Sequence, residues 1–215
     1  MNVTSETRGP RQNPGSQKGV SRDRLLASAT DLFARKGLHK VTTHDIAHGA
    51  GLASGTFYLH FPDKNAIFRE IALQALEELK GRLQRAAEAT EGDPERAVRV
   101  QAEELLRFAE ENRNLVQILF GRDQEAALIG AHVLDQLAEQ SEKAWRSRIE
   151  AGTAGKGLDP QVVTQGVLGM LARVVAWWAE NPGRVPREDV LATLTQLQLY
   201  GAYGTKSRPR GSRDR

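Results

Sequence analysis

The stretch TTHDIAHGAGLASGTFYLH, residues 42–60, decides the fold of the N-terminal part of this chain. Thr42 and Thr43 are good residues to cap a helix, and apolar residues follow them at helical spacing. Two glycines then interrupt this helix, and a second helix opens at Ser54. Two short helices joined by a glycine-containing turn are typical of a helix-turn-helix, whose second helix enters a groove of DNA.

The second of these helices has one apolar side and one polar side. Phe57 and Phe61 stand four residues apart, so we expect them to pack inward together. A recognition helix needs an apolar side to fix its position and polar groups to meet DNA. Gly55 has no Cβ and would allow the DNA backbone to approach closely. The side chains available for hydrogen bonds outward are those of Ser54, Thr56, Tyr58 and His60.

Residues 24–64 resemble the DNA-binding domain of TetR-like transcriptional regulators in the order and spacing of their motifs. The matching segments are RLLASA at 24–29, LFARKG at 32–37, TT at 42–43, DIA at 45–47, AGL at 50–52, GTFY at 55–58, HF at 60–61 and DK at 63–64. The resemblance does not extend to the rest of the chain. The family has Ser or Thr where this chain has Ala53, a poor cap, so we expect Ser54 to cap the recognition helix instead.

The resemblance implies a set of DNA contacts in and around the two helices. Tyr58 is expected to bond a phosphate, because the two phenylalanines already supply the inward pair. Phosphate contacts at His60, Lys64 and the two threonines are implied by relatives, and His44, Ser54 and Thr56 are candidates for reading bases. The predicted DNA-binding residues are therefore Thr42, Thr43, His44, Ser54, Gly55, Thr56, Tyr58, His60 and Lys64.

The histidines raise the alternative of a metal site. His44 and His48 have the i, i+4 spacing that two metal ligands on one helix can have. The chain has no HExxH pattern and no cysteine, and no carboxylate completes a set, so we expect no metal and no other cofactor. No Ser/His/Asp set or glycine-rich phosphate loop after a strand is recognisable either. We therefore predict that the chain is not an enzyme.

Charge is divided unevenly along the chain. Residues 1–65 carry a net charge of +4, residues 66–206 carry −4, and residues 207–215 carry +3. A basic N-terminal segment followed by an acidic remainder fits a DNA-binding domain joined to a regulatory domain. Most runs of charged residues, however, are simply solvent-exposed faces. The N-terminus lacks the apolar region of a signal peptide, and no apolar run approaches the roughly 20 residues of a membrane span. We predict a cytoplasmic protein with no membrane partner.

Helical periodicity continues through the whole chain without a period-two strand pattern, which predicts an all-α fold of about nine helices. We expect a disordered N-terminal arm at 1–20 and a three-helix, helix-turn-helix DNA-binding domain at 21–65. A larger helical domain for ligand binding and dimerisation follows at 66–203, and a disordered basic tail at 204–215. Contact of the N-terminal arm with a DNA minor groove remains open.

The resemblance also implies how the second domain works. In TetR-like proteins the last two helices form a four-helix interface between two subunits, which implies a homodimer on a palindromic operator in double-stranded DNA. Residues 162–179 are apolar around much of the helix, which fits either such an interface or a central place in the core. The candidate interface residues are Val167, Leu171, Val174, Leu191 and Leu194. The candidate residues for lining a ligand cavity are Phe108, Leu115, Leu119, Phe120, Leu134, Trp145, Met170 and Trp177.

These expectations together indicate a ligand-responsive regulator, most simply a repressor that a small-molecule effector releases from its operator. A transcriptional activator and a DNA-binding architectural protein without an effector are the alternatives. A fully packed second domain would favour the architectural protein, and a cavity of several hundred Å3 would favour a sensor.

Overall fold

The described part of the chain is helical throughout. A computed structural model describes residues 14–120, 124–152 and 157–201, and no strand occurs in these ranges. The helices are α1 (Pro14–Lys36), α2 (Thr43–Gly49), α3 (Ser54–Tyr58), α4 (Lys64–Glu88), α5 (Pro94–Glu111), α6 (Arg113–Phe120), α7 (Gln124–Glu150), α8 (Pro160–Glu180) and α9 (Arg187–Tyr200). The prediction of an all-α fold, with a helix-turn-helix domain before a larger helical domain, is confirmed.

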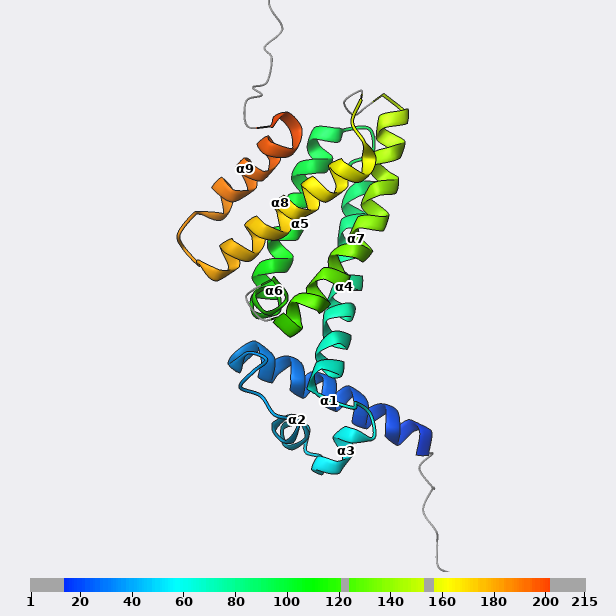
Figure 1. The fold of residues 1–215 in the computed structure, drawn as a ribbon, viewed down its shortest axis with the longest axis vertical. Coiled ribbons are helices and arrows are strands. Elements are labelled where there is room, and N and C mark those ends of the chain that lie inside the picture. The colour runs from blue at the N-terminus through cyan, green and yellow to red at the C-terminus, as the bar shows by residue number, and fades with distance from the viewer. Residues whose placement is uncertain (1–13, 121–123, 153–156, 202–215) are drawn as a thin grey trace, which may run out of the picture. The chain divides into compact units, whose positions relative to one another are not determined.

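The contacts between Cα atoms divide the chain into two units, Met1–Ile71 and Ala72–Arg215, and the boundary falls within α4. In the first unit, α2 packs against both α1 and α3 (Figure 1). The rings of Phe33 and Phe68 meet edge to face, with centroids 5.6 Å apart. The side chains that fill this core are those of Leu25, Ile46, Phe57, Phe61, Ile67 and Phe68.

The start of α1 corrects one prediction. Residues 1–20 were expected to be disordered, but α1 begins at Pro14, seven residues before the expected start at Ser21. Proline is well suited to the first helical position because no partner is needed for its missing N–H. Each glycine in the added segment costs only about 1 kcal/mol of helix stability, which the rest of a long, packed helix can offset. Residues 1–13 and the predicted tail at 204–215 lie outside the described ranges.

Aspartates begin three of the helices. Asp63, Asp93 and Asp159 each accept a hydrogen bond from a backbone N–H two or three residues later, at 2.8 to 3.0 Å. Proline follows Asp93 and Asp159 at the first helical position. The pairing of a capping side chain with proline is a strong local start signal, so the sequence itself marks the starts of α5 and α8.

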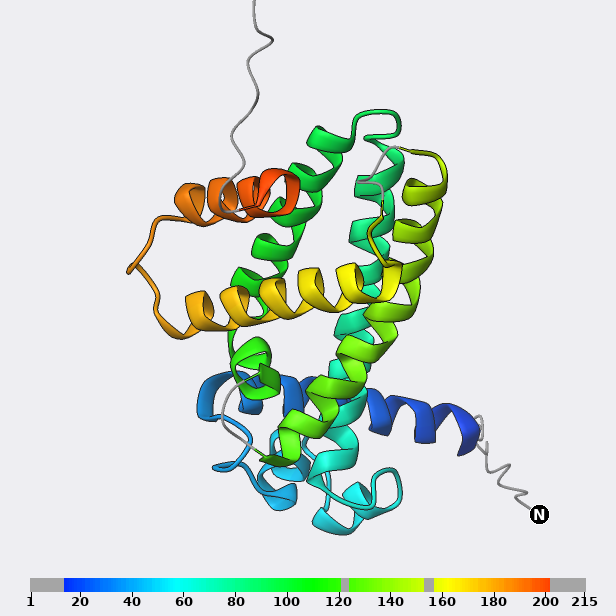
Figure 2. The same ribbon diagram turned by 45° about the horizontal axis from the view of Figure 1, so that its top comes forward.

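The second unit is built from α5 to α9 and the later part of α4. α8 contacts α5, α6 and α7, and α9 packs on α5. Figure 2 shows α8 and α9 running crosswise to α5 and α7. Trp178 is buried in this core, and its Nε1–H donates to the Val185 carbonyl at 3.1 Å, which fixes the turn between α8 and α9.

Charged residues brace α4 against α5. The guanidinium of Arg82 pairs with Glu111 at 2.6 Å and with Glu78 at 2.5 Å, and it lies 5.9 Å from the centre of the Phe108 ring. The hydrogen bonds with Glu111 and then Glu78 raise the pKa of Arg82 above its usual value, so the brace stays charged.

α8 is more apolar than its buried side requires. The helix is long and apolar enough to cross a membrane, whereas we expected no segment of that kind from the sequence. Core helices of proteins that do not span membranes meet the same two conditions. Only a minority of its residues are buried, and Val162 is 70 % exposed. The helix therefore presents apolar surface that the described part of its own chain leaves uncovered.

Candidate nucleic-acid interface and ligand cavity

Thr42 and Asp45 fix the start of the supporting helix α2. Thr42 Oγ1 accepts from the Asp45 N–H at 3.1 Å, and Asp45 Oδ2 accepts from the Thr42 N–H at 2.9 Å. This reciprocal capping box leaves Thr43 as the first helical residue. The hydrogen bonds from Thr42 lower the pKa of Asp45, so the cap weakens only as pH falls through that lowered value, below the ordinary 3.8.

The turn between α2 and α3 depends on Gly51. Its φ of +65° lies in the left-handed region, which a residue with a Cβ rarely adopts. The N–H of Gly51 donates to the His48 carbonyl and that of Leu52 to the Ala47 carbonyl, both at 2.9 Å. This pair of bonds is the Schellman pattern that closes a helix end. A Cβ on Gly51 would also come within 2.7 Å of the Arg24 guanidinium.

The recognition helix α3 is oriented by its phenylalanines. Phe57 is fully buried and Phe61 is 3 % exposed, with ring centroids 5.8 Å apart. Tyr58 is 60 % exposed. The prediction of an inward phenylalanine pair and an outward Tyr58 is confirmed.

The start of α3 corrects a second prediction. Ala53 is the N-cap and makes no side-chain hydrogen bond, so Ser54 does not cap the helix. The extended backbone of Ala53 makes the break, and Ser54 is already the first helical residue. Since a side chain caps a helix from the residue before it, the exposed Ser54 hydroxyl has no capping role.

Hydroxyl groups of the two helices meet at the surface. Thr43 Oγ1 and the Tyr58 hydroxyl lie 3.0 Å apart, and either can donate to the other. The bond joins the first residue of α2 to the last residue of α3. Each hydroxyl can still accept a further hydrogen bond, and the one that does not donate within the pair keeps its proton for another acceptor.

The remaining predicted DNA-binding residues differ in their surroundings. Lys64 is half-buried, and its Nζ donates a hydrogen bond to the Leu38 carbonyl at 2.9 Å. This bond links the start of α4 to the segment after α1, and the sequence did not indicate it. His60 is half-buried, whereas His44 is exposed and its ring stacks on His48 with centroids 6.3 Å apart. Within the described ranges, no group of three His, Cys, Asp or Glu residues has the geometry to hold a metal ion.

This arrangement agrees with comparisons to known proteins. Residues 25–71 match the tetR family of bacterial regulatory proteins. The chain is a TetR-like transcriptional regulator.

Similarity to a relative and to a solved structure extends beyond the first unit. The chain is 27 % identical to the HTH-type transcriptional regulator EthR of Mycolicibacterium smegmatis, over 95 % of this chain and 97 % of that one. It is 42 % identical to the HTH-type transcriptional repressor KstR2 of the same organism, over 32 % of this chain and 34 % of KstR2. The crystal structure of FadR from Bacillus subtilis in complex with stearoyl-CoA shares its fold, with a TM-score of 0.67 and 19 % identity over 83 % of this chain and 98 % of that chain.

The second unit of this TetR-like regulator contains a cavity of about 260 Å3. Six of the eight predicted lining residues do line it: Phe108, Leu115, Leu119, Phe120, Leu134 and Trp145. Met170 and Trp177 do not, because they lie on the side of α8 that packs against the core. The side of α8 that faces the cavity carries Val167, Leu168, Leu171, Ala172 and Val175.

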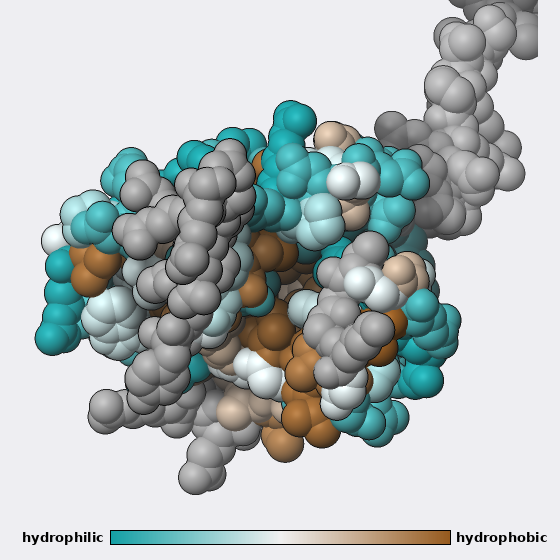
Figure 3. Space-filling view, turned by 90° about the horizontal axis from the view of Figure 1, so that it is seen from above, coloured by the Kyte–Doolittle hydropathy of each residue, from teal (hydrophilic) through white to brown (hydrophobic). Residues whose placement is uncertain are grey.

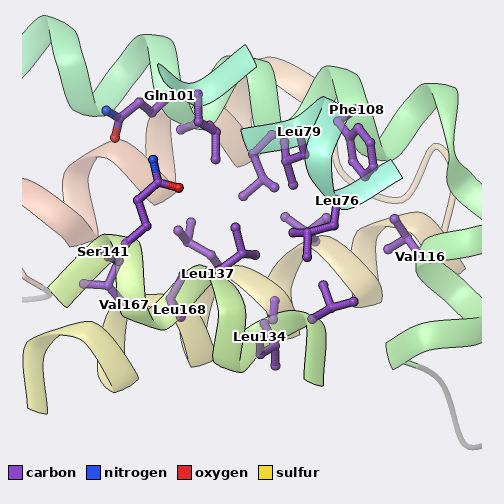
Figure 4. A pocket seen from close by; sticks show the side chains of 18 of the residues that line it. Leu76, Leu79, Gln101, Phe108, Val116, Leu134, Leu137, Ser141, Val167 and Leu168 are labelled. Atoms are coloured by element: carbon purple, nitrogen blue, oxygen red, sulfur yellow. The ribbon is translucent and has the colours of Figure 1, made fainter. Parts of the chain in front are cut away.

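The cavity is apolar along most of its length and polar at one end. Figure 4 shows Gln101 and Ser141 at one end, Phe108 and Val116 at the other, and leucines between them. The other polar lining residues are Gln84, Gln140, Arg148 and Gln198. Figure 3 shows a hollowed face of the molecule in which hydrophobic residues lie among hydrophilic ones.

The predicted dimer residues fall into different environments. Leu194 is 1 % exposed in the core of its own chain, so the prediction that it lies at an interface is wrong: the side of α9 that carries it packs inward. Val167 and Leu171 line the cavity, and Val174 and Leu191 are half-buried against the core. The exposed side of α8 carries Val162, Gln165, Gly166, Gly169 and Arg173.

Substitution Tyr58→Phe tests whether the paired hydroxyls contact phosphate. We expect it to weaken DNA binding by a similar factor on every sequence, because a phosphate contact carries no base information. Fluorescence anisotropy with specific and scrambled duplexes at one salt concentration measures both affinities. A loss confined to one base pair of the operator would contradict the phosphate role, and Tyr200→Phe in the second unit is the matched control.

Proposed function

We propose that this TetR-like regulator is a cytoplasmic repressor that binds a palindromic operator as a homodimer and is released by an amphiphilic small molecule. The observation that carries the proposal is the elongated apolar cavity in the unit that follows the helix-turn-helix. An architectural DNA-binding protein has no need of such a cavity, so its presence favours a sensor over that alternative. Repression rather than activation is supported by the resemblance of the first unit to the repressor KstR2.

The DNA contacts would come from the exposed surface around α2 and α3. Thr42, Thr43, Tyr58, His60 and Lys64 would bond phosphates and set the position of the recognition helix. His44, Ser54 and Thr56 would lie beside the base edges, and Gly55 would permit close approach. Ser54 supports this assignment best, because its hydroxyl is exposed and has no capping role.

The polarity of the cavity indicates the class of effector. Leucine, valine and phenylalanine side chains would hold an extended hydrocarbon body, whose burial is favourable in proportion to its apolar area. Gln101 and Ser141 at the polar end would bond the head group, and Arg148, which also lines the cavity, favours a negatively charged one. Stearoyl-CoA, bound by FadR of the same fold, is a molecule of this kind.

Dimerisation would use the exposed sides of α8 and α9. α8 carries uncovered apolar surface. Among the described residues, apart from the adjacent backbone of α8 itself, nothing lies within 4 Å of where a Cβ would stand on Gly166 or Gly169. Glycines on an exposed helix side allow a second helix to pack closely. Two subunits related by a twofold axis would place their recognition helices about 34–36 Å apart, on one face of the DNA.

Effector binding and DNA binding would be coupled through α4. This helix contributes to both units, and seven of the residues it places in the second unit line the cavity: Ala72, Ala75, Leu76, Leu79, Leu83, Gln84 and Ala87. A ligand that favours one position of α4 would change the affinity for the operator by no more than its preference for that position.

Genomic footprinting with the purified full chain at fixed salt tests the proposal directly. We expect protection of a palindrome of two half-sites, about one DNA turn apart, because a twofold dimer presents two identical helices. Diffuse binding that falls steeply with salt and shows no preferred site would contradict a specific regulator.

Filling the cavity tests its role in release. Leu137→Trp places a larger ring among the lining residues and should leave operator affinity unchanged while abolishing the response to ligand. Stearoyl-CoA at a hundred times its Kd would stabilise the wild type by about 2.7 kcal/mol, a melting shift of a few degrees that the variant should lack. Leu128→Trp, on the exposed side of the same helix, is the matched control. Equal shifts in both variants would place the ligand elsewhere.

A bulky charge on α8 tests the interface. Gly169→Arg should leave the subunit folded, since a side chain there has open space, but should yield monomers that bind the operator poorly. Sedimentation velocity measures the assembly, and Ala89→Arg, at an exposed position after α4, is the control. A dimer that survives Gly169→Arg would exclude this side of α8 from the interface.

A further inference from the structure

Leu59 is an exposed leucine at the end of the recognition helix. Its side chain is 72 % exposed, and it directly follows Tyr58. It is the C-cap residue of α3 and keeps helical backbone angles, with φ −72° and ψ −18°. A single exposed leucine is ordinary on a protein surface, so its place on this helix decides what it means.

The helical geometry places Leu59 opposite the buried side of α3. Residues advance by about 100° around an α-helix, so Gly55 and Leu59, each two positions from Phe57, lie on the side away from it. Phe57 is fully buried, and both Gly55 and Leu59 are exposed. In the described part of the chain, a Cβ on Gly55 would meet no neighbouring atom within 4 Å, so this side of α3 is uncrowded there.

The outermost side of the recognition helix is therefore apolar. Gly55 has no side chain, and Leu59 has no hydrogen-bonding group. The polar candidates flank this side. Ser54 is exposed but lies only about 60° around the helix from Phe57, Thr56 is half-buried, and the ring of His44 is stacked on His48. Among the base edges in the major groove, the C5-methyl group of thymine is the apolar feature.

We propose that Leu59 recognises a thymine in each operator half-site by van der Waals contact with its C5-methyl group. The smooth surface at Gly55 allows the helix to approach closely enough for this contact. Burying the leucine against the methyl removes apolar surface of both from water, so thymine is favoured over bases that lack the methyl at that position. This inference rests on the proposed operator binding and adds a specificity residue to it.

Deoxyuridine tests the contact, because it differs from thymidine only by the missing methyl group. The full chain is titrated by anisotropy against duplexes of the footprinted operator in which one thymine per half-site is replaced at a time. We expect one symmetric replacement to weaken wild-type binding roughly three- to fivefold per half-site, the effect of one buried methyl. Leu59→Ala should bind the thymine operator more weakly and lose sensitivity to that replacement. Leu128→Ala, which truncates an exposed leucine in the second unit, should behave like the wild type.

The outcomes separate this inference from the proposed function. Wild-type protein that binds no operator specifically would overturn the proposed function itself. Specific wild-type binding that is insensitive to every deoxyuridine, an operator without thymine in its half-sites, or a Leu59→Ala variant with unchanged methyl sensitivity would overturn the role of Leu59 alone.

Discussion

The burial of Phe57 is the constraint on which the candidate DNA surface depends. A helix of five residues is too short to be stable in water by itself, so α3 exists only because its inner side packs into the core. Once Phe57 is fixed, the helical repeat determines where every other residue of α3 points. The Tyr58–Thr43 hydrogen bond and the Gly51 turn then set the angle between the two helices. A surface for reading DNA thus follows from one buried ring and two local restraints.

The second unit meets a different requirement, because it must fold around an incompletely filled interior. Its core lies mainly between α5, α8 and α9, where Leu106, Val175, Trp178 and Leu194 are nearly fully buried. The cavity lies to one side of that core, and the Arg82 brace holds α4 to α5 along it. Stability in this unit therefore comes from a packed region adjoining the space that a ligand would occupy.

The sequence predicted the features that depend on local rules. Periodicity alone predicts the all-helical fold and the division of Phe57 and Tyr58 between core and surface. Capping rules account for the starts of α5 and α8 at aspartates. Errors arose where a choice between neighbouring residues depends on tertiary contacts. Leu194 and Trp177 carry the correct chemistry for an interface and a cavity, but the way α8 and α9 are rotated about their axes decides which side each faces, and no local pattern encodes that rotation. The Lys64–Leu38 bond was likewise invisible, since it joins residues far apart in the chain.

Each unit has buried residues of its own, and this bears on how such a protein can change over evolutionary time. Among the described residues, the buried cluster of the second unit runs from Leu79 in α4 to Leu194 in α9. Mutations that reshape the cavity can therefore accumulate without disturbing the packing that orients Phe57. The first unit is constrained by the packing that presents its DNA-binding surface, whereas the residues that line the cavity of the second unit are not under that constraint. A family match at residues 25–71, with lower identity to a relative when nearly the whole chain is aligned, is the pattern that such uneven freedom would leave in a sequence.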